Sequence, residues 1–311
     1  MSIRTLRYLA GWQLVAALVL LGPMAPGSAA SMGRPPAEPY SSLDLTFVSE
    51  GATLSGTLFL PQGRPIFAAA VFVQGAGRDT RDVYFGRSFA GLGVALFVYD
   101  KRGVGKSGGV YAGTEVRTNN VSRENLALLQ DDAAAAFTAL DREAVLRGVP
   151  RGFIGISQAG WIIPAAARKV RVARFMVFFS GAAETTHEDV LFEHRTANDP
   201  GFWDHHTHEE VRSMLKGVVD PFGWPDFDPR NDLKRLRIPG LWMYGGRDRN
   251  VDVDLCMERL GELAAHGHPN FEYRVYPSYD HFLGQYGQDV LVPAVTWIQQ
   301  TGIRTQQMSE N

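Results

Sequence analysis

The stretch Gly152-Phe-Ile-Gly-Ile-Ser-Gln-Ala-Gly-Trp-Ile-Ile163 joins two apolar runs through a turn of small residues. Residues Gly152–Gly155 have the pattern of a strand buried on both faces, and Trp161–Arg168 have the pattern of a helix. A sharp strand-to-helix turn lifts the side chain at its apex above the sheet, and it needs small neighbours because larger side chains would collide there. The stretch therefore predicts that Ser157 lies exposed at the carboxyl end of a buried strand.

Strand and helix patterns alternate on both sides of this stretch. Such alternation predicts a mainly parallel sheet with helices on both faces, and functional groups at the carboxyl ends of the strands. Seven further strands are predicted, the first two as a hairpin: Asp44–Glu50, Thr53–Leu60, Phe67–Val73, Gly93–Tyr99, Arg174–Ser180, Gly240–Gly245 and Phe271–Tyr276. Helices are predicted over Val83–Leu92, Asn125–Leu146, Val253–Ala265 and Val290–Gln299.

Residues 182–237 break this alternation because they contain no clear buried strand. The segment is rich in histidine and aromatic residues, and we interpret it as a helical cap inserted into the α/β core. The aromatic side chains are expected to form the core of the cap, and some of them to line an acyl pocket. The predicted core thus has two parts, residues 43–181 and 238–303, and a tail follows over 304–311.

The first thirty residues have the layout of a secretory signal. Arg4 and Arg7 precede an apolar run of about 14 residues, and small residues follow up to Ala30, after which we expect cleavage. The run is shorter than the roughly 20 residues that span a bilayer as a helix, although an uncleaved membrane anchor is the alternative. Residues 31–42 are rich in proline and are predicted to form a linker. The sequence therefore predicts an exported protein, periplasmic or secreted, without stable insertion in the membrane after cleavage.

The composition is that of a soluble globular protein and excludes several classes. The chain has 311 residues, of which 45% are hydrophobic and 21% charged, so it is neither disordered nor collagen-like. The formal net charge of −2 gives no basic excess for binding nucleic acid. Cys256 is the single cysteine, so the chain can form neither an internal disulfide nor a multi-cysteine zinc site.

A serine hydroxyl becomes a nucleophile only when a nearby base removes its proton. Asp248 follows directly after one predicted strand, and His281 lies in the loop after the next. Asp252 and Asp254 are alternatives for the acid, although they are better placed to cap the following helix. The histidines of the cap precede the acid in the chain, which favours His281 as the base.

The order Ser157, Asp248, His281 resembles that of the serine hydrolases of the α/β-hydrolase family. The resemblance covers roughly residues 43 to 300 and rests on four motifs: Gln74-Gly-Ala-Gly77, Asp100-Lys-Arg-Gly-Val-Gly105, the serine turn and Gly246-Arg-Asp-Arg-Asn-Val-Asp252. Two positions depart from the family pattern, since Gln74 replaces a usual histidine and Ala159 a usual glycine. Neither change removes a catalytic group.

The resemblance implies an α/β-hydrolase fold, an eight-stranded and mostly parallel sheet with a cap. Within the family, the chain resembles esterase-like members of the serine aminopeptidase-like or dienelactone hydrolase-like branch. Ser157 matches the nucleophile, His281 the general base and Asp248 the acid that orients the imidazole. The oxyanion hole is expected to use the N–H groups of Gln158 and Ala76.

The implied activity is hydrolysis of a small carboxylic ester, or of a thioester, through an acyl-enzyme, without a metal or an organic cofactor. A peptidase or amidase of the same fold is one alternative, and a non-catalytic binding protein is another. The sequence states neither the natural substrate nor the oligomeric state.

Two other patterns have structural interpretations that we favour. Gly103-Val-Gly-Lys-Ser-Gly108 matches a dinucleotide-binding pattern, but no apolar helix follows it. We expect Asp100 and Arg102 to brace this loop instead. His205, His206 and His208 lack the spacing of a helical metal-binding pair, and a solvated helix start is the favoured interpretation.

Overall fold

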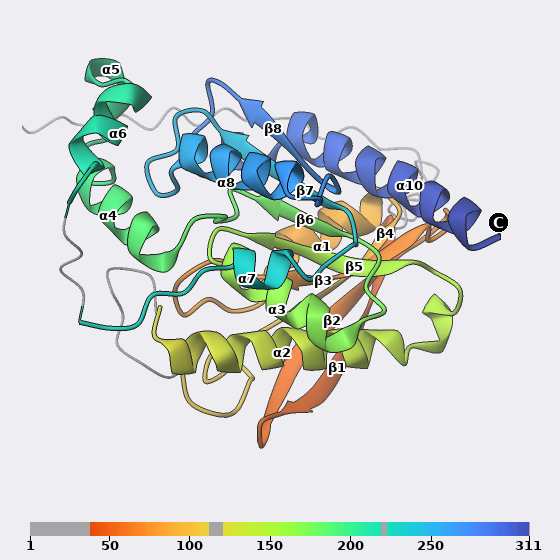
Figure 1. Ribbon diagram of the computed structural model, residues 1–311. Coiled ribbons are helices and arrows are strands. Elements are labelled where there is room, and N and C mark those ends of the chain that lie inside the picture. Colours follow the sequence, from red (N-terminus) through yellow and green to blue (C-terminus); the bar gives the residue numbers. More distant parts are fainter. Residues whose placement is uncertain (1–37, 112–120, 219–222, 311) are drawn as a thin grey trace, which may run out of the picture. The chain divides into compact units, whose positions relative to one another are not determined.

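The computed structural model describes residues 38–111, 121–218 and 223–310, with side chains described up to residue 301 (Figure 1). Within these residues eight strands form one sheet in the order β1-β2-β4-β3-β5-β6-β7-β8. The pairs β1–β2 and β2–β4 are antiparallel, and the other neighbours are parallel. The strands are β1 Tyr40–Ser49, β2 Ala52–Pro61, β3 Ala68–Val73, β4 Val94–Tyr99, β5 Arg151–Ile156, β6 Met176–Phe179, β7 Gly240–Gly245 and β8 Phe271–Tyr276.

Burial along the strands follows their position in the sheet. Every residue of β3, β4, β6 and β7 is buried, as expected for central strands covered on both faces. Strand β8 lies at the edge and leaves most of its residues exposed, although its sequence pattern was enough to predict it. The eight predicted strands are all present, and the predicted fold class is confirmed.

Helices cover both faces of the sheet (Figure 1). Helices α2, α3, α7 and α8 share one apolar core with the sheet, and α1, α9 and α10 share the core on the other face. The helices of the core are α1 Val83–Gly91, α2 Arg123–Asp141, α3 Ala159–Val170, α7 Arg230–Leu233, α8 Val253–Ala265, α9 Leu283–Tyr286 and α10 Gln288–Glu310, with a short 3₁₀ turn at Ala144–Leu146.

Most predicted boundaries lie within two residues of the observed ones, and three elements differ more. Strand β1 begins at Tyr40, within the predicted linker, because Tyr40 still pairs with Pro61 in the hairpin. Helix α2 ends at Asp141, and the rest of the predicted helix forms the 3₁₀ turn. Helix α10 runs to Glu310 through the predicted tail, since no proline follows Pro293 to end it. The predicted signal segment and residues 31–37 of the linker lie outside the described residues.

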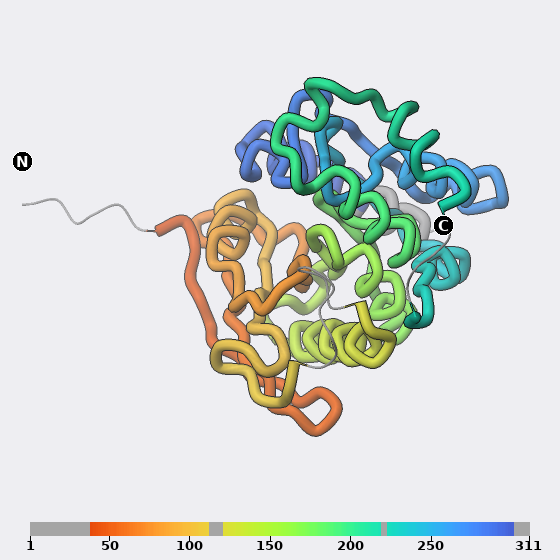
Figure 2. Tube along the Cα trace, turned by 90° about the vertical axis from the view of Figure 1, so that its left-hand side faces the viewer, coloured from red at the N-terminus to blue at the C-terminus, as the bar shows by residue number. Residues whose placement is uncertain are grey.

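The described residues of the predicted cap segment, 182–237, contain helices and no strand, but its last helix, α7, packs in the core of the sheet because Leu233 is buried there. The segment also contains α4 Thr186–Thr196, α5 Phe202–His205 and α6 His208–Leu215. Both α4 and α6 begin with a capping box, in which a threonine side chain and a glutamate three residues later satisfy the first N–H groups. Phe192, Phe202 and Val211 are buried together, so aromatic residues of the cap form its core. Figure 2, viewed toward this end of the sheet, shows the cap beside the C-terminal elements of the core.

Within the described residues no helix has the length and hydrophobicity that crossing a bilayer requires.

Candidate active site

Ser157 lies at the apex of the turn between β5 and α3, where the sequence predicted it. Its backbone φ is 51°, in the left-handed region that L-residues rarely adopt. The Ser157 N–H donates to Phe179 O at 3.0 Å, and the Ser157 carbonyl accepts from Gly160 N–H at the same distance. The neighbouring strand and the first turn of α3 therefore fix the strained backbone from both sides.

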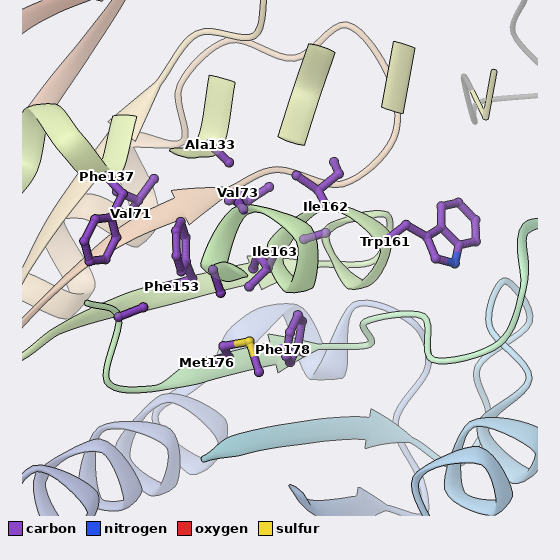
Figure 3. Close-up of a cluster of buried hydrophobic side chains, with 14 of the residues drawn as sticks. Val71, Val73, Ala133, Phe137, Phe153, Trp161, Ile162, Ile163, Met176 and Phe178 are labelled. Carbon is purple, nitrogen blue, oxygen red and sulfur yellow. The ribbon is translucent and has the colours of Figure 1, made fainter. Parts of the chain in front are cut away.

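Packing beneath the turn holds this conformation in place. Ile162 and Ile163 are fully buried on α3, among side chains of β3, β5 and β6 (Figure 3). A Cβ atom at Gly155 would lie 2.5 Å from the Cβ of Ala159, so the missing side chain at Gly155 makes room for the alanine. This explains why the turn accepts Ala159 where the family pattern has glycine.

Asp248 and His281 meet across two loops at the carboxyl end of the sheet. Oδ2 of Asp248 lies 2.8 Å from Nδ1 of His281, and the Asp248 side chain is fully buried. The other carboxylate oxygen, Oδ1, accepts from the backbone N–H groups of Asn250 at 2.8 Å and Val251 at 3.0 Å. The backbone of its own loop thus fixes the orientation of the carboxylate toward the imidazole.

The environment of His281 favours its protonated form. Burial lowers the pKa of His281, but the negative charge of Asp248 and its hydrogen bond outweigh burial, and Asp280 and Glu193 add to the effect, so that the pKa is raised above its ordinary value. An imidazole in this setting readily accepts a proton and is stabilised once it is charged.

The two alternative acids, Asp252 and Asp254, contact other groups. Asp252 accepts from Leu255 N–H at 3.1 Å and caps α8, as expected for the alternative acid. Asp254 lies in the first turn of α8, with Oδ2 3.9 Å from Nδ1 of His208. Of the three candidate acids, Asp248 is therefore the one hydrogen-bonded to His281.

Hydrogen bonds connect the histidine loop and the serine turn through the loop after β6. Ser180 Oγ donates to His281 O at 2.8 Å, and the preceding residue, Phe179, accepts from Ser157 N–H. Ala182 N–H also donates to the Ser157 carbonyl, at 3.2 Å. The loop after β6 is thus the common support of both segments.

The first glycine turn, after β3, lies directly against the serine. A Cβ atom at Gly75 would lie 3.2 Å from the Cβ of Ser157. The Nζ of Lys101, a buried residue after β4, donates to Gly77 O at 2.8 Å and also to Gly75 O. Lys101 therefore fixes the carbonyls on either side of Ala76, the residue expected to contribute to the oxyanion hole.

Lys101 is a residue whose role the sequence interpretation missed. A lysine two residues after an apolar strand was an available signal, since lysine is rarely buried unless its charge is satisfied. Its partners, however, are carbonyls that lie 24 and 26 residues earlier in the chain. No local pattern could identify them.

The loop with the dinucleotide-like pattern has the structural role that the sequence predicted. Asp100 accepts from the guanidinium of Arg81 and from Lys106 N–H, while Arg102 forms a buried ion pair with Asp132. The Arg81 contacts outweigh burial and hold the pKa of Asp100 below its ordinary value. Both side chains therefore brace this loop against the core.

The cap histidines correct one expectation. His205 is exposed, but His208 is only partly exposed: its ring stacks on Trp203 with centroids 4.1 Å apart, and its Nε2 lies 3.0 Å from Gly246 O. His208 does begin α6, as predicted, but it is not simply solvated, because its ring joins the cap to the core. No group of three or more metal-ligating side chains in the described part of the chain is arranged to hold an ion.

Comparison with known proteins identifies the fold. No protein-family model matches the chain, and no curated protein matches it in sequence. An esterase of Pyrococcus furiosus is similar in structure, with a TM-score of 0.59 at 18% identity over 85% of this chain and 91% of that one. A dienelactone hydrolase of Anabaena variabilis gives a TM-score of 0.53 at 14% identity over 86% and 98%.

An acylaminoacyl peptidase of Pyrococcus horikoshii is also similar, with a TM-score of 0.54 at 15% identity. The match covers 78% of this chain but only 37% of the peptidase. These similarities show that the chain has the α/β-hydrolase fold.

Proposed function

We propose that this protein is a serine hydrolase that cleaves small carboxylic esters, or thioesters, through an acyl-enzyme. The observation that carries the proposal is the 2.8 Å contact between Asp248 and His281, in a loop tied to the strained turn that bears Ser157. A buried acid, an imidazole and a serine on such a turn, in this chain order, are the parts of a nucleophilic triad.

Each group has one role in the proposed mechanism. Ser157 Oγ attacks the carbonyl carbon of the ester while Nε2 of His281 takes the hydroxyl proton. Asp248 stabilises the imidazolium through Nδ1. The negative charge on the former carbonyl oxygen is stabilised by the N–H groups of Gln158 and Ala76, at the start of α3 and in the first glycine turn.

Breakdown of this tetrahedral intermediate releases the alcohol, or the thiol, which leaves with the proton held by His281. Water then attacks the acyl-enzyme, His281 again accepts the proton, and collapse releases the acid and restores the serine. Because His281 must be neutral to act as the base, activity is expected to rise with pH through the pKa of His281.

The first test is the variant Ser157→Ala, assayed with a simple aryl ester. We expect loss of turnover, because the nucleophile is removed, with the circular dichroism spectrum unchanged. Labelling of the unmodified protein at Ser157 by a fluorophosphonate is the companion measurement. Full activity of the folded variant would rule out the proposed chemistry.

The leaving group is tested with a matched series of an ester, a thioester and an amide that share one acyl group. The proposal expects the ester or the thioester to be cleaved fastest. Preferential cleavage of the amide would make the protein a peptidase or an amidase. No labelling and no turnover in the whole series would favour a binding protein that keeps the fold.

We also propose that the protein is exported and that a signal peptidase cleaves it after Ala30. The proposal is supported by the basic start, the short apolar run and the small residues of the first thirty positions. N-terminal sequencing of the mature protein, expressed with its full leader, is the test. A mature protein that begins at Met1 and pellets with membranes would instead make the segment an anchor.

A further inference from the structure

The loop that bears the candidate acid is bound to the cap at every residue from Gly246 to Asn250. Each of these five consecutive residues contacts a cap side chain or a cap carbonyl. The contacts are His208 Nε2 with Gly246 O at 3.0 Å, Arg247 Nη2 with Asp204 Oδ1 at 2.5 Å, Trp203 Nε1 with Asp248 O at 2.8 Å, Arg249 Nη1 with Ala197 O at 2.8 Å and Asp199 O at 2.9 Å, and Asn250 Nδ2 with Glu193 Oε1 at 3.2 Å.

Asn250 connects these contacts to the carboxylate itself. Its backbone N–H donates to Asp248 Oδ1 at 2.8 Å, while its side chain donates to Oε1 of Glu193. Glu193 is buried on α4, where a carboxylate is costly unless it is hydrogen-bonded. A continuous path of hydrogen bonds therefore runs from the cap helix through Asn250 to Asp248, and from there to His281.

A second contact from the cap holds the backbone of Asp248. Trp203 donates from Nε1 to the backbone carbonyl of Asp248, and its ring lies against His208, which reaches Gly246. The backbone of Asp248 is thus held by the cap, whereas its carboxylate is held by the loop that the cap supports. Small displacements of catalytic groups can cost a large part of the rate, so a firmly held loop has a catalytic consequence.

We propose that the cap is a positioning element of the triad, in which Glu193 and Asn250 fix the orientation of the Asp248 carboxylate and Trp203 fixes its backbone. The inference rests on the proposed function and extends it to the cap. It makes residues 193–208 of the cap a fixed support of the loop that bears the acid.

The first arm of the test separates orientation from charge. Asn250→Ala removes the hydrogen bond but keeps the carboxylate of Glu193, and kcat for the aryl ester is expected to fall on the order of tenfold or more, with KM changed less than about twofold. Glu193→Gln keeps the Oε1 acceptor but removes a negative charge. The rate at high pH is then retained, while the acidic limb of the pH profile moves to lower pH.

This direction follows from the charges that face His281. Asp248, Asp280 and Glu193 all raise its pKa, so removing the charge of Glu193 lowers that pKa and leaves the base neutral at lower pH. If Asn250 and Glu193 only stabilised the fold, Glu193→Gln would not move the acidic limb of the pH profile. Asn250→Ala would then not lower kcat in a folded protein.

Two further variants complete the design. Trp203→Phe replaces the indole with a smaller aromatic ring that lacks the N–H donor, and a similar loss in kcat is expected, so the proposal remains testable if Asn250→Ala does not fold. Arg212→Ala is the matched control, because it breaks a contact between α6 and α8, with Glu258, that does not reach the acid loop. It is expected to leave kcat unchanged.

A second readout is independent of turnover. The proton between Nδ1 of His281 and Asp248 is expected to give a strongly downfield NMR signal, which Asn250→Ala should shift or broaden. Unchanged kcat and an unchanged signal in the folded Asn250 and Trp203 variants would overturn the positioning role, as would an equal loss in the Arg212 control. An inactive unmodified protein that fails to react at Ser157 would instead overturn the proposed function, while the NMR signal still reports on positioning.

Discussion

At the residue scale, Ser157 combines an unfavourable backbone conformation with an accessible position above the sheet. A side chain in the left-handed region costs about 1–2 kcal/mol relative to the right-handed one. The hydrogen bonds from Ser157 N–H to Phe179 O and from Gly160 N–H to Ser157 O hold the residue in this state. The turn thus holds a partly buried serine at the carboxyl end of β5 at the expense of stability.

This strain can be measured by comparing two substitutions at the same position. Ser157→Gly is expected to have a higher free energy of unfolding than Ser157→Ala by about 0.5–1 kcal/mol, because glycine adopts a φ of 51° without strain but gains more entropy on unfolding. Urea denaturation of the two inactive variants gives the comparison. A less stable glycine variant would show that the turn carries no such strain.

At the element scale, the first glycine turn depends on an element to which it is not adjacent in the chain. Lys101, in the loop after β4, donates to the carbonyls of Gly75 and Gly77 in the turn after β3. With both carbonyls directed at the lysine, the turn keeps a fixed shape beside Ser157. Parallel strands bring these two loops together, since their carboxyl ends lie at one edge of the sheet.

We expect Lys101→Met to damage both stability and rate. Each buried carbonyl that loses its donor costs about 1–3 kcal/mol of unfolding free energy, and kcat is expected to fall on the order of tenfold or more as the turn moves. Chemical denaturation and aryl ester turnover measure the two effects. Lys169→Met, which removes a half-exposed lysine paired with Asp131, is the control and should change neither by much.

An unchanged kcat in Lys101→Met, at a reduced stability, would limit this lysine to a structural role. An unchanged stability would show that water or another donor replaces it.

At the scale of the whole molecule, the boundary between core and cap buries acidic side chains. Glu184, between β6 and α4, is fully buried; its Oε2 accepts from Ala183 N–H at 2.9 Å and from the thiol of Cys256. Burial raises the pKa of Glu184 from 4.5 to about 7, and the charge of Asp252 adds to this. The folded protein therefore binds this proton more tightly than the unfolded chain does.

The sign of the resulting pH dependence follows from linkage. The contribution of Glu184 to stability is complete below pH 4.5 and is lost as the pH rises through about 7, because the unfolded chain loses the proton first. Glu184→Gln has no such proton to lose. Between pH 4.5 and a pH above about 7, its free energy of unfolding should therefore rise relative to that of the unmodified protein by up to about 3 kcal/mol. Urea denaturation at several pH values tests this, and parallel curves for the two proteins would contradict it.

The predictable part of the molecule is the part that local patterns encode. The buried runs of β3, β4, β6 and β7 are almost continuous stretches of apolar residues, and the turn at Ser157 has its signal within a few positions. The ends of elements were less predictable. The extension of β1 to Tyr40 depends on its pairing with Pro61, and pairing is not encoded in a single strand.

By itself, the sequence of this protein determined the alternation of strands and helices, the strained serine turn and the order of the candidate acid and base. These features depend on residues near one another in the chain, and the spacing and polarity of such residues are enough to predict them. Only the tertiary structure decided that Asp248, and not its neighbours, contacts His281, that Lys101 supports the first turn, and that the cap binds the acid loop. Each of these contacts joins segments that are distant in the chain, and folding of the parallel sheet and its insertion brings them together.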